Sequence, residues 1–156
     1  DPLFSANVTN PIEPYAELIR YYRDRWAHYG HDPADALVGA GTAGYYAART
    51  SQEAIETWRP IFEARQEAFR RVGVEPVFTS AEDAVARSSA LVGSPQQIIE
   101  KVQRYHEQFG HEVIHLHADR DGLTEKQHRT TLELFQSDIA PTLRQLIPSR
   151  PFPGGI

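Results

Sequence analysis

Apolar side chains recur along this chain at two spacings, and the two spacings alternate from one segment to the next. Short continuous apolar runs favour buried strands, and they occupy residues 2–8, 36–48 and 113–116. Elsewhere apolar residues return every three or four positions, as on one face of a helix. The helices predicted in this way are residues 14–29, 51–69, 95–109 and 125–146. Because strands and helices alternate, the pattern indicates an α/β chain with parallel strands.

The segment 95–109 has the clearest helix signals at both ends. Ser94 can cap the first turn, Pro95 suits the first helical position, and Gln97 stands where a capping box needs it. Gly110 ends the helix. The inward face is formed by Ile98, Val102, Tyr105 and Phe109. We therefore expect helix, turn, short buried strand and helix again in this part of the chain.

Two segments carry neither spacing. Residues 72–92 read as an irregular insertion with one short helix at 81–88, and residues 148–156 read as an extended C-terminal tail because they are rich in proline and glycine. The remainder, residues 1–147, is expected to form one domain. Three strands would leave long unprotected edges, and the chain enters a strand almost at once after Asp1. We therefore expect further strands outside this sequence, which would then be a truncated or cleaved product.

Composition narrows the classes of function. The chain has 156 residues, of which 40% are hydrophobic and 24% charged, as in one ordinary globular domain. A net charge of -5 without a basic run argues against nucleic-acid binding. The absence of cysteine excludes disulfides, thiolate metal ligands and a cysteine nucleophile. No membrane span or signal peptide is evident, so we expect a cytoplasmic protein.

His115 and His117 are the leading candidates for chemistry. They are two residues apart on a predicted strand, so their side chains point the same way as that of Val113, while Ile114, Leu116 and Ala118 point to the other side. They can serve as hydrogen-bond or acid/base groups facing a ligand, or they can be satisfied core histidines. A zinc site is not expected, because His111 precedes the strand and no further ligand converges on the pair.

Two more polar residues stand at predicted strand ends. Asn7 ends the first strand and can bond a ring or carbonyl, although asparagine also simply favours turns. Arg120 follows the histidine strand and can hold an anionic group, although a solvated turn explains it as well. The glycine-rich run at 39–44 is no dinucleotide-binding motif, because an extended segment follows it where that motif requires a helix.

Several segments together resemble the C-terminal half of the bacterial-luciferase-like flavin-dependent monooxygenases. They are PLFSANV, YYRDRWAHYGHDP, ARTSQEA, GSPQQI and LELFQSDIAPTLR, and the resemblance runs through nearly the whole chain. Members of that family fold as a (β/α)8 TIM barrel about twice this length. By this resemblance the chain supplies about the last three β/α units of the barrel, and it is incomplete on its own.

The resemblance also implies a chemistry. The parent protein would oxidise a small organic substrate with reduced FMN and O2, with a flavin reductase as a possible partner. The best-characterised catalytic groups of the family lie in the half that is absent here, so no catalytic or cofactor-binding residue is assigned and the chain alone is expected to be inactive. His117, His115, Asn7 and Arg120 are the candidates for the pocket wall. A deazaflavin-dependent hydride-transfer enzyme and a non-catalytic half-barrel binding module remain alternatives, and association with the missing half or with a second copy is expected.

Overall fold

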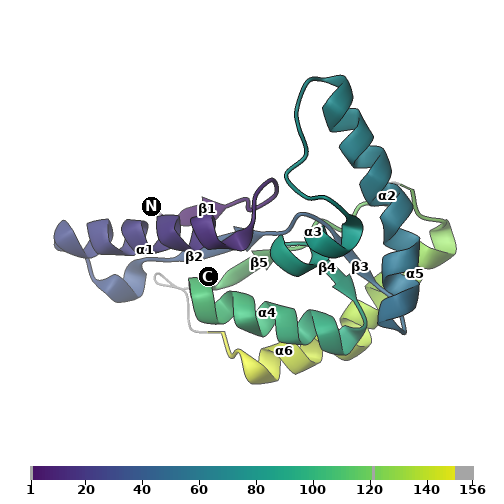
Figure 1. Ribbon diagram of the computed structural model, residues 1–156. Coiled ribbons are helices and arrows are strands. Elements are labelled where there is room, and N and C mark those ends of the chain that lie inside the picture. Colours follow the sequence, from purple (N-terminus) through teal and green to yellow (C-terminus); the bar gives the residue numbers. More distant parts are fainter. Residues whose placement is uncertain (1, 121, 150–156) are drawn as a thin grey trace.

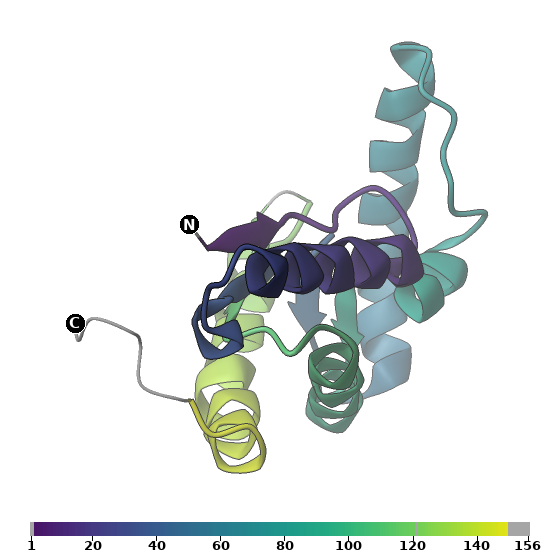
Figure 2. The same ribbon diagram turned by 90° about the vertical axis from the view of Figure 1, so that its left-hand side faces the viewer.

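Five short parallel strands and six α-helices make up the protein, seen here as a computed structural model that describes residues 2–120 and 122–149 (Figures 1 and 2). The strands are β1 (Leu3–Ser5), β2 (Val38–Gly41), β3 (Tyr45–Ala47), β4 (Leu91–Gly93) and β5 (Val113–His115). The helices are α1 (Ile12–His28), α2 (Ser51–Arg71), α3 (Ala81–Arg87), α4 (Pro95–Phe109), α5 (Glu125–Leu134) and α6 (Ala140–Leu146). A 3-10 turn (Pro33–Asp35) precedes β2, and a π-helical segment (Phe135–Ile139) joins α5 to α6. Residues 150–156 of the predicted tail lie outside the described residues.

The strands form two sheets. In the first, β2 is central and pairs in parallel with β1 and with β5; in the second, β3 pairs in parallel with β4. The parallel α/β architecture predicted from the alternation is therefore confirmed. The predicted strand 36–48 is wrong in one respect, because it divides into β2 and β3, which have different neighbours. The division falls at Thr42, whose hydroxyl bonds the backbone of the β5 segment.

The segment 72–92 is more regular than the sequence predicted. The short helix expected there is confirmed as α3, but the segment also runs into β4, which the prediction missed. All three residues of β4 are buried, yet a run of three apolar residues carries no readable alternation. The sequence signal was too short, and only the pairing with β3 defines the strand.

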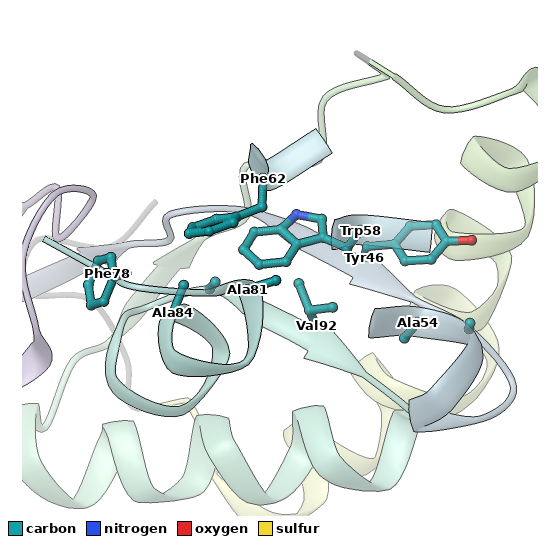
Figure 3. Close-up of a cluster of buried hydrophobic side chains, with 10 residues drawn as sticks. Tyr46, Ala54, Trp58, Phe62, Phe78, Ala81, Ala84 and Val92 are labelled. Atoms are coloured by element: carbon teal, nitrogen blue, oxygen red, sulfur yellow. The ribbon is translucent and has the colours of Figure 1, made fainter. Parts of the chain in front are cut away.

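The β3–β4 sheet is covered on both faces. On one face Tyr46 and Val92 pack with Trp58 and Phe62 of α2 and with α3 (Figure 3). On the other face, the apolar cluster consists of Tyr45, Ala47, Leu91, Ile98, Ile99, Val102 and Ile139, from β3, β4, α4 and the π-helical segment. Two hydrogen bonds join β3 to α5, since the Tyr45 hydroxyl donates to the Thr131 carbonyl at 3.1 Å and the Ala47 N–H donates to Thr131 Oγ1 at 2.6 Å.

The described residues cover the β1–β2–β5 sheet on one face only. There Val38 and Ala40 pack with Ile19 of α1 and with Tyr105 and Phe109 of α4. Phe4 and Val113 belong to the opposite face, and they remain 56% and 44% exposed. Gly39 leaves room for the Phe4 ring, because a Cβ at position 39 would lie 2.7 Å from that ring.

Helix ends follow the signals in the sequence. Thr50, Ser94 and Thr124 each accept the backbone N–H three residues on, and Thr124 forms a reciprocal capping box with Gln127. Gly110 ends α4 in the left-handed conformation, as predicted. Within the described residues, no helix is long and apolar enough to cross a membrane.

Candidate functional site

The ends of β2 and β5 are tied together by one hydroxyl. Thr42 Oγ1 donates to the His115 carbonyl at 3.1 Å and accepts the backbone N–H of His117 at 2.9 Å. Thr42 is 1% exposed, so both bonds are shielded from water. The chain therefore leaves β5 along a fixed path, and this path sets the positions from which the His115 and His117 side chains project.

Asn7 occupies a strained position just beyond β1. It is the one non-glycine residue with positive φ among those described, at 55°, and it is buried. Its Oδ1 accepts from the Ser5 hydroxyl and its carbonyl accepts from the Ser89 hydroxyl, while Ser89 Oγ in turn accepts the Ala43 N–H at 2.7 Å. Left-handed backbone is uncommon in residues other than glycine and stores strain, although less at asparagine than at most residues, and here these bonds hold the backbone in place.

The side-chain amide of Asn7 is left with an unused donor. Its Nδ2 is buried and has no hydrogen-bond partner. A buried amide donor without an acceptor costs about 1–3 kcal/mol, so native proteins seldom keep one without a reason. A carbonyl or ring nitrogen of a bound molecule would satisfy it.

His115 and His117 lie on the same side of the β5 segment, as their spacing predicted, and both are exposed. Their ring centroids are 6.3 Å apart, and Phe4 lies edge-on to His115 at 6.4 Å. Ile114 and Leu116 pack into the core on the other side. The strand itself ends at His115, so His117 lies just beyond it. The Nε2 of His117 contacts the carboxylate of Asp119, which fixes the orientation of the ring.

Arg120 lies apart from this group. It is exposed, and its carbonyl accepts the Leu123 N–H at 2.8 Å in the turn before α5. Its guanidinium has no partner among residues 2–120 and 122–149. The structure thus places Asn7 and the two histidines at strand ends and leaves Arg120 in a solvated turn. In the described part of the chain no group of three His, Cys, Asp or Glu side chains has metal-binding geometry.

The hydroxyls of Ser5, Thr42 and Ser89 were missed by the reasoning from sequence. Each stands within three residues of a strand end, and each bonds the backbone or side chain of a neighbouring segment. A hydroxyl residue next to a predicted strand is a frequent pattern, so the sequence alone does not distinguish these three. Their roles follow from contacts between segments that are up to 82 residues apart.

A second feature is an apolar pocket of about 270 Å³ beside this group. The aromatic side chains at its wall are Trp58, Phe62 and Phe69 of α2 and Phe78 before α3. Figure 3 shows Trp58 and Phe62 side by side, with ring centroids 5.3 Å apart. Arg65 also lines the pocket, and its Nη1 donates to the Ala43 carbonyl at 2.8 Å.

Comparison with known proteins identifies the group to which the chain is similar. The family model of the luciferase-like monooxygenases matches residues 1–112. No protein of curated function matches the sequence.

Solved structures with a similar fold include three monooxygenases. The monooxygenase RslO1 from Streptomyces bottropensis aligns over 90% of this chain and 41% of its own, with a TM-score of 0.65 and 23% identity. The oxygenating constituent of 3,6-diketocamphane monooxygenase from Pseudomonas putida, in complex with FMN, aligns over 96% and 49%, with a TM-score of 0.60 and 21% identity. A long-chain alkane monooxygenase aligns over 96% and 37%, with a TM-score of 0.57 and 16% identity. The chain spans less than half the length of each of these proteins.

Proposed function

Because the chain belongs to the luciferase-like monooxygenase family, we propose that it is the C-terminal part of a flavin-dependent monooxygenase that oxidises a small organic substrate with reduced FMN and O2. The observation that carries the proposal is the family match together with polar side chains at the ends of parallel strands, where β/α barrels build their active sites. The similar diketocamphane monooxygenase was solved with FMN, which supports the choice of cofactor.

The described residues fit a flavin ring in one specific respect. A flavin presents carbonyl oxygens and ring nitrogens, and the buried Nδ2 of Asn7 is a donor that lacks an acceptor. His117, oriented by Asp119, would offer a second polar group to the ring. When bound, the reduced flavin supplies the electrons that activate O2, while the protein orients the substrate and excludes water. In this proposal Asn7, His115 and His117 form one wall of the pocket, and Arg120 lies at its rim.

The incomplete covering of the first sheet supports a partial barrel. Parallel sheets are nearly always covered on both faces, yet Phe4, Val113 and His115 share a face left open by the described residues. In this proposal residues 1–147 supply about the last three β/α units, and the remaining strands close the barrel over that face. The activity then requires those strands, and the chain alone is inactive.

The proposal is tested on the protein expressed from its complete reading frame. Anaerobic titration with reduced FMN, followed by flavin fluorescence, should give saturable binding, and admission of air with candidate substrates should give product. Asn7→Ala and His117→Ala should each weaken flavin binding or turnover by about tenfold. The matched control is Arg71→Gln, which changes an exposed side chain on α2.

Each alternative has its own result in the same experiment. Binding of a reduced deazaflavin with hydride transfer, in place of FMN binding, would replace the monooxygenase with a hydride-transfer enzyme. Failure to bind either cofactor in the complete protein would favour a binding module. Unchanged affinity and turnover in both variants would remove Asn7 and His117 from the pocket wall.

A further inference from the structure

The aromatic pocket beside the strand ends has features of a ligand site that are independent of the flavin. It is built on one face of α2, where Trp58, Phe62, Arg65 and Phe69 recur at helical spacing. The opposite wall comes from Phe78 and from the apolar segment before it. Trp58, Phe62 and Phe78 are buried, so the walls of the pocket belong to the core of the second sheet.

Two hydrogen-bond donors reach the same short backbone segment at this pocket. Arg65 Nη1 donates to the Ala43 carbonyl, and the Trp58 indole Nε1 lies 3.5 Å from where a Cβ on Gly44 would stand. Within the described residues, Trp58 Nε1 has no acceptor and Arg65 has neither a second acceptor nor an ion-pair partner. An indole N–H is a donor only, and a guanidinium carries five N–H groups. The pocket therefore offers donors and a positive charge without matching acceptors.

The size and the walls define the ligand. An apolar cavity of about 150 Å³ holds benzene, so about 270 Å³ admits a molecule of about ten non-hydrogen atoms. Aromatic walls favour an aromatic ring in edge-to-face or offset contact. A guanidinium that bonds a single backbone carbonyl and has no ion-pair partner among the described residues favours a carboxylate. From these features we propose that the pocket binds a small aryl carboxylate, with the ring against Trp58 and Phe62 and the carboxylate at Arg65.

One acidic group opposes this assignment electrostatically. Glu75 also lines the pocket, but it is exposed, so water screens its charge. Glu75 repels a ligand carboxylate at the mouth of the pocket, whereas Arg65 attracts it beside the Ala43 carbonyl. Removal of the Glu75 charge should therefore increase the affinity for a carboxylate ligand. The affinity for a neutral ligand should not increase, and this difference distinguishes the two.

The test uses phenylacetate as the probe and Trp58 as the reporter. The protein is expressed from its complete reading frame, and the variant Trp58→Phe identifies the part of the fluorescence change that comes from the pocket. Phenylacetate should change the Trp58 fluorescence saturably, with a Kd of about 0.1–1 mM as expected for a ligand of this size. 2-Phenylethanol, which has the same ring without the charge, should bind about tenfold more weakly. Cyclohexylacetate measures the contribution of the aromatic ring.

Variants separate the role of Arg65 from general packing. Arg65→Gln should weaken phenylacetate binding about tenfold, so that the variant binds phenylacetate and 2-phenylethanol with equal affinity. Glu75→Gln should strengthen phenylacetate binding. The matched control Arg71→Gln, on the exposed side of the same helix, should leave both affinities unchanged. If Arg65→Gln does not fold, Val77→Phe tests the same pocket, because it fills the mouth from an exposed position without adding an indole.

The outcomes are decisive in either direction. Absence of saturable binding would overturn the site. Equal affinity for phenylacetate and 2-phenylethanol, or an Arg65→Gln variant that binds as well as the parent, would overturn the carboxylate assignment. Retention of full affinity in Val77→Phe would place the binding elsewhere. All of these measurements are made without flavin, so their failure is distinguishable from failure of the monooxygenase proposal.

Discussion

The two sheets of this protein are built from the same kind of parallel strand, but they are covered differently. The β3–β4 sheet has helices on both faces, and its residues Tyr45, Leu91 and Val92 are buried. The β1–β2–β5 sheet has α1 and α4 on one face, while Phe4 and Val113 on the other face stay exposed. A short strand therefore does not determine its own burial. The helices packed against it do, and the first sheet lacks half of that covering within the described residues.

The strongest contrast between the sheets is expected in stability. Leu91→Ala removes a fully buried side chain from β4 and should lower the free energy of unfolding by about 2–5 kcal/mol. Val113→Ala, at a strand position of the first sheet, should cost less than about 0.5 kcal/mol because its side chain is already exposed. Urea unfolding of both variants measures the difference. Equal losses would mean that Val113 is covered in solution.

The free energy of unfolding is expected to depend on pH through His111, which lies on the covered side of the first sheet. Burial, with the charges of His106 and Arg23, lowers the pKa of His111 from 6.5 to about 4. Between these values the unfolded chain binds a proton that the folded chain does not, so the free energy of unfolding falls as the pH drops from 6.5 to 4. The loss attributable to this group reaches about 3 kcal/mol at pH 4.

His111→Phe tests that effect, since a phenyl ring retains the contacts with Tyr105 and Phe109 and cannot be protonated. Urea unfolding at a series of pH values should show the acid-induced loss reduced by about 3 kcal/mol in the variant. Val113→Ala, on the open face, should keep the acid dependence of the parent. An unaltered pH profile in His111→Phe would refute the role of His111.

A smaller effect is expected where the open sheet carries the candidate site. Thr42→Val removes the hydroxyl that bonds the His115 carbonyl and the His117 N–H, and should cost about 1–2 kcal/mol. The amide of His117 should also exchange with solvent faster, as measured by hydrogen exchange. Thr130→Val on α5 is the control, because its hydroxyl has no partner among the described residues. Unchanged hydrogen-exchange protection of the His117 amide would contradict this role of the Thr42 hydroxyl.

The smallest effect on stability is expected from a charge on the open face. Val113→Lys should change the free energy of unfolding by less than about 0.5 kcal/mol. If the open face pairs with a second copy, the same variant should lower the mass measured by analytical ultracentrifugation towards that of a monomer. A parent chain that sediments as a folded monomer would contradict self-association through this face.

The sequence predicted those parts of the fold that local chemistry determines. Ser94 and Gly110 bound α4 as expected, because a cap acts within one turn of its own helix. The parallel architecture also followed from the alternation of segments. In contrast, β4 was missed and one predicted strand proved to be two, because pairing partners distant in sequence decide both features. The same holds for the candidate site, where the orientation of His115 and His117 was predictable, whereas the strained backbone of Asn7 depends on Ser5 and Ser89.

The bonds between β3 and Thr131 also bear on the order in which the chain folds. They join residues 84 and 86 positions apart, and β2 pairs with β5 across a similar stretch of sequence. During synthesis β3 leaves the ribosome before α5 has been translated. The Tyr45 hydroxyl and the Ala47 N–H therefore lack their Thr131 acceptors until then. Contacts of such high sequence separation slow folding. The nascent chain therefore reaches its final packing only after nearly all of the described residues have been translated, and until then it depends on protection from aggregation.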